Sequence, residues 1–143
     1  MRKTLTPGVL AALLALLYVA GGCTMLNRGP SDKDLLGELL STYETALVDG
    51  DADKLISLYS ESYESSDGTN YEEAMTRLRR IVPMFEEWSI EVGTAETQIV
   101  VKGDTATLSP VVFDTPGGGM TLTILATKDA GGVWLITGSE MER

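Results

Sequence analysis

The sequence predicts an α+β fold in which three N-terminal helices pack on a curved antiparallel sheet of about four strands. Two observations predict it. Apolar residues recur at helical spacing from residue 31 to about residue 85, whereas residues 89–139 are rich in Val, Ile, Thr and Leu and are interrupted by glycine-containing turns. A chain of 143 residues suits a single folded domain, which we place at residues 31–143.

The first two predicted helices are separated by a glycine. Ser31 and Asp34 form a capping pair before the first helix, Gly50 stops it, and Asp51 caps a shorter second helix. The apolar residues that turn inward along the two helices are Leu36, Leu39, Leu40, Tyr43, Leu47, Leu55, Ile56, Leu58 and Tyr59. The polar stretch 60–69 is rich in turn-forming residues and is predicted to lie between helices.

The third helix is predicted to start at Asn70, with Glu73 three residues on, and to kink or finish near Pro83, which cannot donate a backbone N–H. Its buried face would consist of Met75, Leu78, Ile81, Val82 and Phe85.

Turn signals at 102–104, 116–119 and 129–132 divide the rest of the chain into four predicted strands. These strands are 89–101, 105–114, 120–128 and 133–139. Because the connections are short, neighbouring strands should pair as antiparallel hairpins.

Residues 1–22 are typical of an export signal peptide. Arg2 and Lys3 precede the apolar run VLAALLALLYVA, which is too short to cross a bilayer, since a spanning helix needs about 20 residues. The sequence Ala20-Gly-Gly-Cys23 that follows resembles the lipobox of bacterial lipoproteins, in which the cysteine is diacylated and the chain is cut before it.

Cys23 is therefore the predicted lipidation site, and residues 23–30 are a lipidated tether that makes the membrane a partner. Thr24, rather than Asp, follows the cysteine, which resembles lipoproteins sent to the outer membrane of diderm bacteria. The predicted location is thus the bacterial cell envelope. Two alternatives remain: an uncleaved signal anchor, and an ordinary cleavage site beside a chance cysteine.

Composition excludes several classes of function. The chain has no histidine, one cysteine, and 11 Lys and Arg against 21 Asp and Glu, which gives a formal charge of −10. Imidazole catalysis and His-ligated zinc are therefore excluded, and the charge argues against binding nucleic acid. We predict no metal and no cofactor. We expect Arg77, in the basic cluster 77–80, to pair with Glu73 on a solvated helix face.

Residues 49–53 (DGDAD) open like a calcium-binding loop. However, Lys54 stands where such a loop needs glycine, and Ser60 stands where it needs glutamate. We therefore interpret the segment as a helix end followed by the cap of the next helix.

Two segments resemble the NTF2-like superfamily, the cone fold shared by ketosteroid isomerases and SnoaL-type cyclases. The first is YETALVDGDADKLISLY (residues 43–59), similar to the family's helix, Gly-Asp corner and second helix. The second is DAGGVWLI (residues 129–136), similar to its last hairpin and Trp-bearing strand. The resemblance implies a cone and, because such sheets often pair, a homodimer. It does not imply a function, since enzymes, ligand binders and scaffolds share this architecture.

The resemblance to ketosteroid isomerases also places two candidate catalytic residues. Tyr43 would donate a hydrogen bond to an enolate oxygen, and Asp67 would move the proton. The chemistry is sound in principle, because an Asp in an apolar cone is a competent base. The family's further acid on the third strand is missing here, because residues 122–127 (LTILAT) contain none.

Large, soft side chains predict an apolar pocket in the cone. They are Tyr59, Tyr63, Met84, Phe85, Trp88, Phe113 and Met120. We therefore favour a non-enzymatic, lipid-anchored envelope protein that binds a small apolar ligand or a protein partner. Two alternatives remain: a proton-transfer or hydrolytic enzyme that uses Tyr43 and Asp67, and a purely structural envelope protein whose cone is filled.

Overall fold

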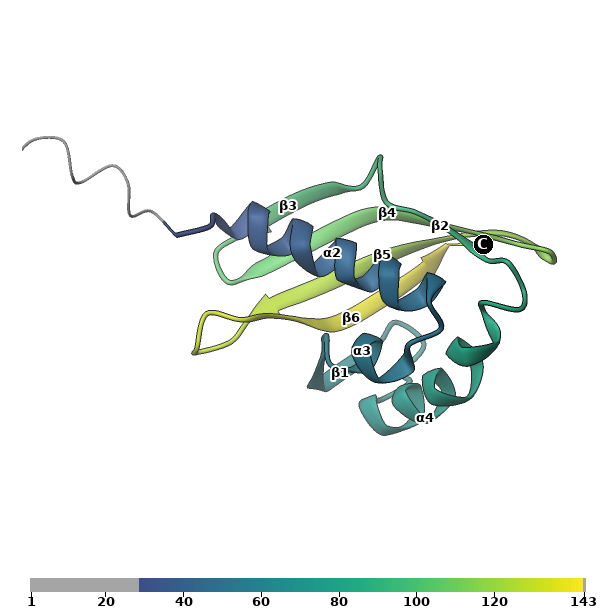
Figure 1. Ribbon diagram of the computed structural model, residues 1–143. Coiled ribbons are helices and arrows are strands. Elements are labelled where there is room, and N and C mark those ends of the chain that lie inside the picture. Colours follow the sequence, from purple (N-terminus) through teal and green to yellow (C-terminus); the bar gives the residue numbers. More distant parts are fainter. Residues whose placement is uncertain (1–28, 143) are drawn as a thin grey trace, which may run out of the picture. The chain divides into compact units, whose positions relative to one another are not determined.

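The computed structural model describes residues 29–142 (Figure 1). The predicted export signal and the lipidation site Cys23 lie outside the described residues. The helices in the described part are α2 (Asp32–Val48), α3 (Ala52–Ile56) and α4 (Tyr71–Ile81), followed by the single 3₁₀ turn η1 (Val82–Met84). None of the helices in residues 29–142 is long and apolar enough to span a bilayer.

The helix boundaries follow the predicted caps. The backbone N–H of Lys54 donates to the Asp51 carboxylate at the start of α3, which confirms the cap interpretation of residues 49–53. The backbone N–H of Glu73 donates to the Asn70 side chain at the start of α4. Pro83 lies in η1, directly after α4 ends, as its missing N–H requires.

In the described residues, the sheet has six strands rather than the four predicted. They are β1 (Tyr59–Ser65), β2 (Glu91–Gly93), β3 (Gln98–Lys102), β4 (Thr105–Thr115), β5 (Gly118–Lys128) and β6 (Trp134–Glu142). The path is β1-β6-β5-β4-β2, and β3 also pairs with β4. The predicted antiparallel pairing is confirmed from β3 through β6.

β1 corrects the prediction that residues 60–69 form only turns. It pairs in parallel with β6, with Ser65 opposite Ser139. The strand was missed because it is serine-rich and lies at the edge of the sheet, where most of its side chains meet solvent. Tyr63 is the buried residue of β1.

The second correction concerns the predicted strand 89–101, which is broken into β2 and β3. Both halves pair with β4, on either side of an irregularity between Leu108 and Val111. Pro110 lies in that irregularity and cannot donate to a neighbouring strand, and its carbonyl instead accepts a hydrogen bond from the Thr97 hydroxyl at 2.6 Å. The segment between β2 and β3 therefore leaves the sheet.

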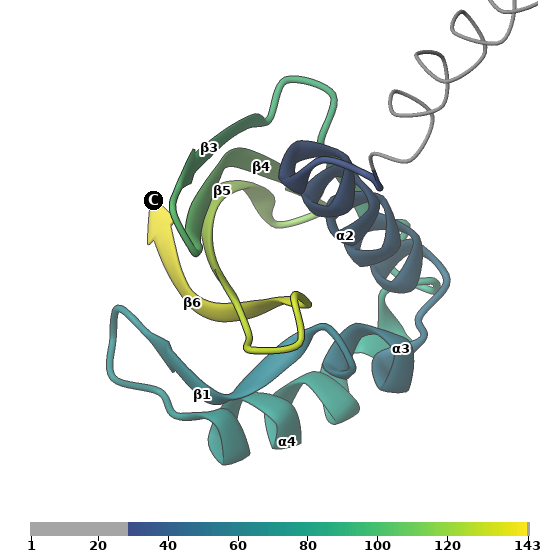
Figure 2. The same cartoon turned by 90° about the vertical axis from the view of Figure 1, so that its left-hand side faces the viewer.

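The sheet curves around an apolar core. Figure 2 shows β3 to β6 as an arc, with α2 across its concave side and α4 beside β1 at one edge. Along β5 the predicted alternation is confirmed, because Leu122, Ile124 and Ala126 are buried while the intervening residues are half-exposed. Leu36 of α2 and Leu55 of α3 are fully buried in this core, and the two helices contact each other.

Candidate functional site: an open apolar cavity

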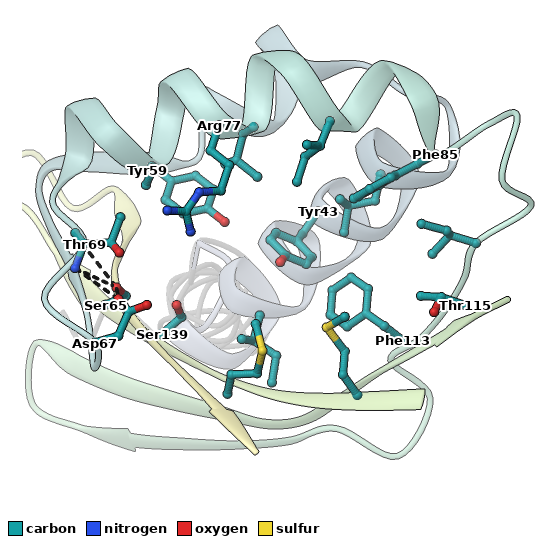
Figure 3. Close-up of a pocket in the computed structure, with 18 of the residues that line it drawn as sticks. Tyr43, Tyr59, Ser65, Asp67, Thr69, Arg77, Phe85, Phe113, Thr115 and Ser139 are labelled. Carbon is teal, nitrogen blue, oxygen red and sulfur yellow. Dashed lines mark hydrogen bonds between the residues drawn. The ribbon is translucent and has the colours of Figure 1, made fainter. Parts of the chain in front are cut away.

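A cavity of about 930 Å³ lies between α4 and the concave side of the sheet. Its walls come from α2, β1, the turn between β1 and α4, α4 itself, residues 85–90, and the adjoining parts of β4, β5 and β6. Figure 3 shows side chains from these elements pointing toward a common space. The volume is within the range of about 300–1,000 Å³ that is typical of small-molecule sites.

The floor of the cavity is buried and largely apolar, whereas its rim is exposed. The buried lining residues are Tyr43, Leu47, Tyr63, Ala74, Phe113 and Leu122. Three large apolar side chains on the rim are exposed to solvent: Trp88 (46%), Met120 (36%) and Met141 (56%). Exposed apolar side chains gathered around a cavity are typical of a binding site, and methionines adapt readily to a ligand's shape.

Three tyrosines form a connected cluster in the wall. The rings of Tyr59 and Tyr63 meet edge to face with centroids 5.1 Å apart, and Tyr43 lines the same cavity. The Tyr63 hydroxyl hydrogen-bonds to the Ser139 hydroxyl at 2.6 Å. Burial raises the pKa of both Tyr43 and Tyr59 well above the ordinary tyrosine value. These phenols therefore stay protonated at physiological pH and offer the cavity neutral polar groups.

Asp67 lies at the rim, in the turn between β1 and α4, and its carboxylate holds this turn together. It accepts hydrogen bonds from the Ser65 hydroxyl and, at 3.1 Å, from the backbone N–H of Thr69 (Figure 3). The Ser65 hydroxyl and the Thr69 backbone N–H lower the pKa of Asp67 to about 2.

Tyr43 and Asp67 both line the cavity, but their environments do not suit the predicted catalytic pair. A general base works best when its pKa is near the working pH, and a carboxylate with a pKa of about 2 holds a proton too weakly. Asp67 is also exposed rather than placed in the apolar floor.

Arg77 is exposed, as predicted for a solvated helix face, but it does not form the predicted pair with Glu73. Within residues 29–142 the ion pairs involve Lys128 and not Arg77. Arg77 lines the cavity, and Figure 3 shows its guanidinium directed toward the space between Tyr59 and Ser139. It follows Ala74 by three residues and precedes Leu78 and Ile81 on the same inward stripe of α4. That spacing was the sequence signal for its direction.

Six of the seven large, soft residues predicted to line a pocket lie in the cavity wall: Tyr59, Tyr63, Phe85, Trp88, Phe113 and Met120. Met84 is in η1, half-buried, and is not part of the lining. Besides Arg77, the sequence analysis did not assign the hydroxyl-bearing residues Ser65, Ser66, Thr69, Thr115 and Ser139 to the lining, because small polar side chains are not a signal for an apolar pocket.

Comparison with solved structures identifies the fold. Bd1075 of Bdellovibrio bacteriovorus aligns with a TM-score of 0.60 at 18% identity, over 74% of this chain and 38% of Bd1075. An NTF2-like protein of unknown function from Shewanella baltica aligns with a TM-score of 0.59 at 15% identity, over 80% of this chain and 99% of that one. The fold is NTF2-like.

A third similar structure is a candidate ketosteroid isomerase from Shewanella frigidimarina, with a TM-score of 0.59 at 16% identity over 76% of this chain and 94% of the other. This chain thus spans well under half of Bd1075 but nearly all of the two Shewanella proteins. No protein-family model matches the sequence, and no curated protein matches it significantly. At these identities, the likeness describes architecture and not activity.

Proposed function

We propose that this chain is a lipid-anchored protein of the bacterial cell envelope whose NTF2-like domain binds a small apolar ligand. The observation that carries the proposal is the cavity of about 930 Å³, with its buried apolar floor and the exposed Trp88, Met120 and Met141 on its rim. A ligand in this cavity would cover the apolar floor and the exposed rim side chains. Burying this apolar surface would favour binding by about 25 cal/mol for each Å² removed from water.

Separate observations argue against the two alternatives, the structural protein and the enzyme. A purely structural protein with a filled cone has no need of an open space of this size. An isomerase-like enzyme needs a base of suitable strength, and the hydrogen bonds to Asp67 make its carboxylate a weak one. The missing acid in residues 122–127 points the same way.

Mass spectrometry of the protein purified from its native membranes tests the proposal. Under gentle ionisation, we expect a small apolar molecule to accompany the protein in near-equimolar amount and to dissociate on denaturation. The mass of the denatured chain should correspond to a polypeptide that starts at Cys23 and carries acyl chains. A native protein that reproducibly carries no small molecule would contradict ligand binding.

The Cys23→Ser variant is the control for the anchor. Without the thiol no acyl chain can be attached, so the variant should leave the membrane pellet and appear in the soluble fraction. If Cys23→Ser remains in the pellet with its apolar N-terminal run intact, the uncleaved signal anchor is the correct interpretation. The occupant of the cavity can be determined in either case, so the two parts of the proposal are tested separately.

A further inference from the structure

We propose that the cavity selects an amphipathic monocarboxylate, whose head is bound by Arg77 and whose hydrocarbon tail occupies the apolar part. This inference rests on the proposed ligand-binding function and specifies the ligand's chemistry. It arises from an asymmetry in the lining: the charged Arg77 and Asp67 lie at one end with the hydroxyl groups of Ser65, Thr69 and Ser139, whereas Thr115 is at the other end beside Phe113 (Figure 3).

Arg77 is the cation of the lining; its side chain is exposed, and its N–H groups have no protein acceptor in the part of the chain that the structure describes. It takes part in neither of the ion pairs there, and no side chain or carbonyl accepts a hydrogen bond from it. A guanidinium carries five N–H donors in a rigid fork that matches a carboxylate with two parallel hydrogen bonds. Because the group is directed into the cavity (Figure 3), an incoming acceptor can reach it.

Asp67 lies at the same end but does not take the place of this acceptor. One of its carboxylate oxygens already accepts from both Ser65 and Thr69, which fixes it in the turn. Arg77 acts on Asp67 only through its charge, without an ion pair between them. The negative charge of Asp67 repels further negative charge near Arg77. One guanidinium therefore suits a ligand with a single negative charge better than a phosphate with nearly two.

The opposite end of the cavity accepts a hydrocarbon tail. Figure 3 shows Phe85 and Phe113 away from the polar end, with Tyr43 between the two regions. Phe113 is buried, and Trp88 and Met120 extend the apolar wall to the rim. A molecule with a charged head and a long apolar tail matches both ends, whereas a wholly apolar molecule would leave Arg77 without a partner.

The overall charge of −10 does not prevent anion binding at Arg77. At an ionic strength of about 0.15 M, the Debye length is about 8 Å, so exposed acids elsewhere on the protein are largely screened. Contacts within the cavity are screened much less, and they decide which head group is preferred.

The acylated protein, stripped of any small molecule that co-purifies in its cavity and kept in mild detergent, can be titrated with a series of ligands that share one tail. The probes are dodecanoate, dodecyl phosphate, dodecanol and dodecylammonium, with binding followed by Trp88 fluorescence and calorimetry. We expect dodecanoate to bind about tenfold or more tightly than dodecanol, because a charge-assisted hydrogen bond adds to the same apolar burial. The Arg77→Gln variant should lose that preference and leave dodecanol affinity nearly unchanged.

Arg80→Gln is the matched control, because Arg80 is an exposed arginine of the same helix that does not line the cavity. It should keep the preference for dodecanoate. If dodecanol binds as well as dodecanoate, or if Arg77→Gln retains the preference, the head-group inference is wrong and apolar binding stands. If dodecyl phosphate binds most tightly, the assignment of a monocarboxylate head group is wrong. If no probe binds saturably, the proposed function itself fails.

Discussion

Asp32, the first residue of α2, contacts two side chains of the β5–β6 hairpin. Its carboxylate accepts hydrogen bonds from the Lys128 ammonium at 3.0 and 3.2 Å and from the Trp134 indole N–H at 3.1 Å. The Lys128 ammonium also lies 5.5 Å from the centre of the Trp134 ring. The hydrogen bonds from Lys128 and Trp134 lower the pKa of Asp32, so ionised Asp32 stabilises the fold.

We predict that this stabilisation depends on pH. Because the folded pKa of Asp32 is below the ordinary value of 3.8, its contribution is complete above about pH 4 and is lost as the pH falls through the lowered pKa. Wild type should therefore be more stable than Asp32→Asn at pH 7, and the difference should shrink below pH 4. Urea unfolding followed by tryptophan fluorescence measures both. A difference that stays constant down to pH 2.5 would rule out the charge as its cause.

At the scale of single elements, two glycines of the helical region should respond in opposite directions to the same substitution. Gly37 is inside α2, and a Cβ there meets nothing within 4 Å, so Gly37→Ala should raise the free energy of unfolding by roughly 0.5–1 kcal/mol. Gly50 has φ +67° between α2 and α3, and Gly50→Ala should lower it by roughly 1–2 kcal/mol. Denaturant unfolding of the two variants beside wild type would show this. Changes of the same sign would contradict the backbone argument.

The elements that the sequence predicted well are those with a strong local pattern. The helix caps at Asp51 and Asn70 and the alternation in β5 depend on residues close together in the chain, and all were confirmed. β1 was missed because a serine-rich edge strand has no apolar alternation, and its pairing with β6 joins residues more than seventy positions apart. The break between β2 and β3 depends on Pro110 in a different strand.

The candidate site shows the same division. Aromatic residues such as Phe85 and Phe113 could be assigned to a pocket from their type, since large apolar side chains turn toward the core. The spacing of Arg77 from Ala74, Leu78 and Ile81 indicates the face of α4 on which it lies, but the cavity beside that face depends on how α4 packs against β1, a strand that the sequence did not predict. The weakness of Asp67 as a base comes from two hydrogen bonds within a turn, and spacing along the chain cannot indicate them.

At the scale of the whole molecule, a cavity that is occupied only in the folded state should couple ligand binding to stability. At a free ligand concentration of a hundred times Kd, that coupling is worth about 2.7 kcal/mol, or roughly a 10 °C rise in Tm for a domain of this size. We predict this rise for delipidated wild-type protein in dodecanoate. Leu78→Trp should abolish most of it, because Leu78 lines the cavity from α4 and a larger indole would occupy the ligand's space.

Val133→Trp is the matched control for that prediction, since Val133 is 53% exposed and is not part of the lining. Differential scanning calorimetry with and without ligand compares the shift within each variant, so differences in the variants' own stability cancel. Val133→Trp should keep the wild-type shift, because the added indole lies outside the cavity. An equal shift in Leu78→Trp would mean that dodecanoate binds elsewhere. The absence of a shift in wild type at saturation would mean that binding and folding are not coupled through this cavity.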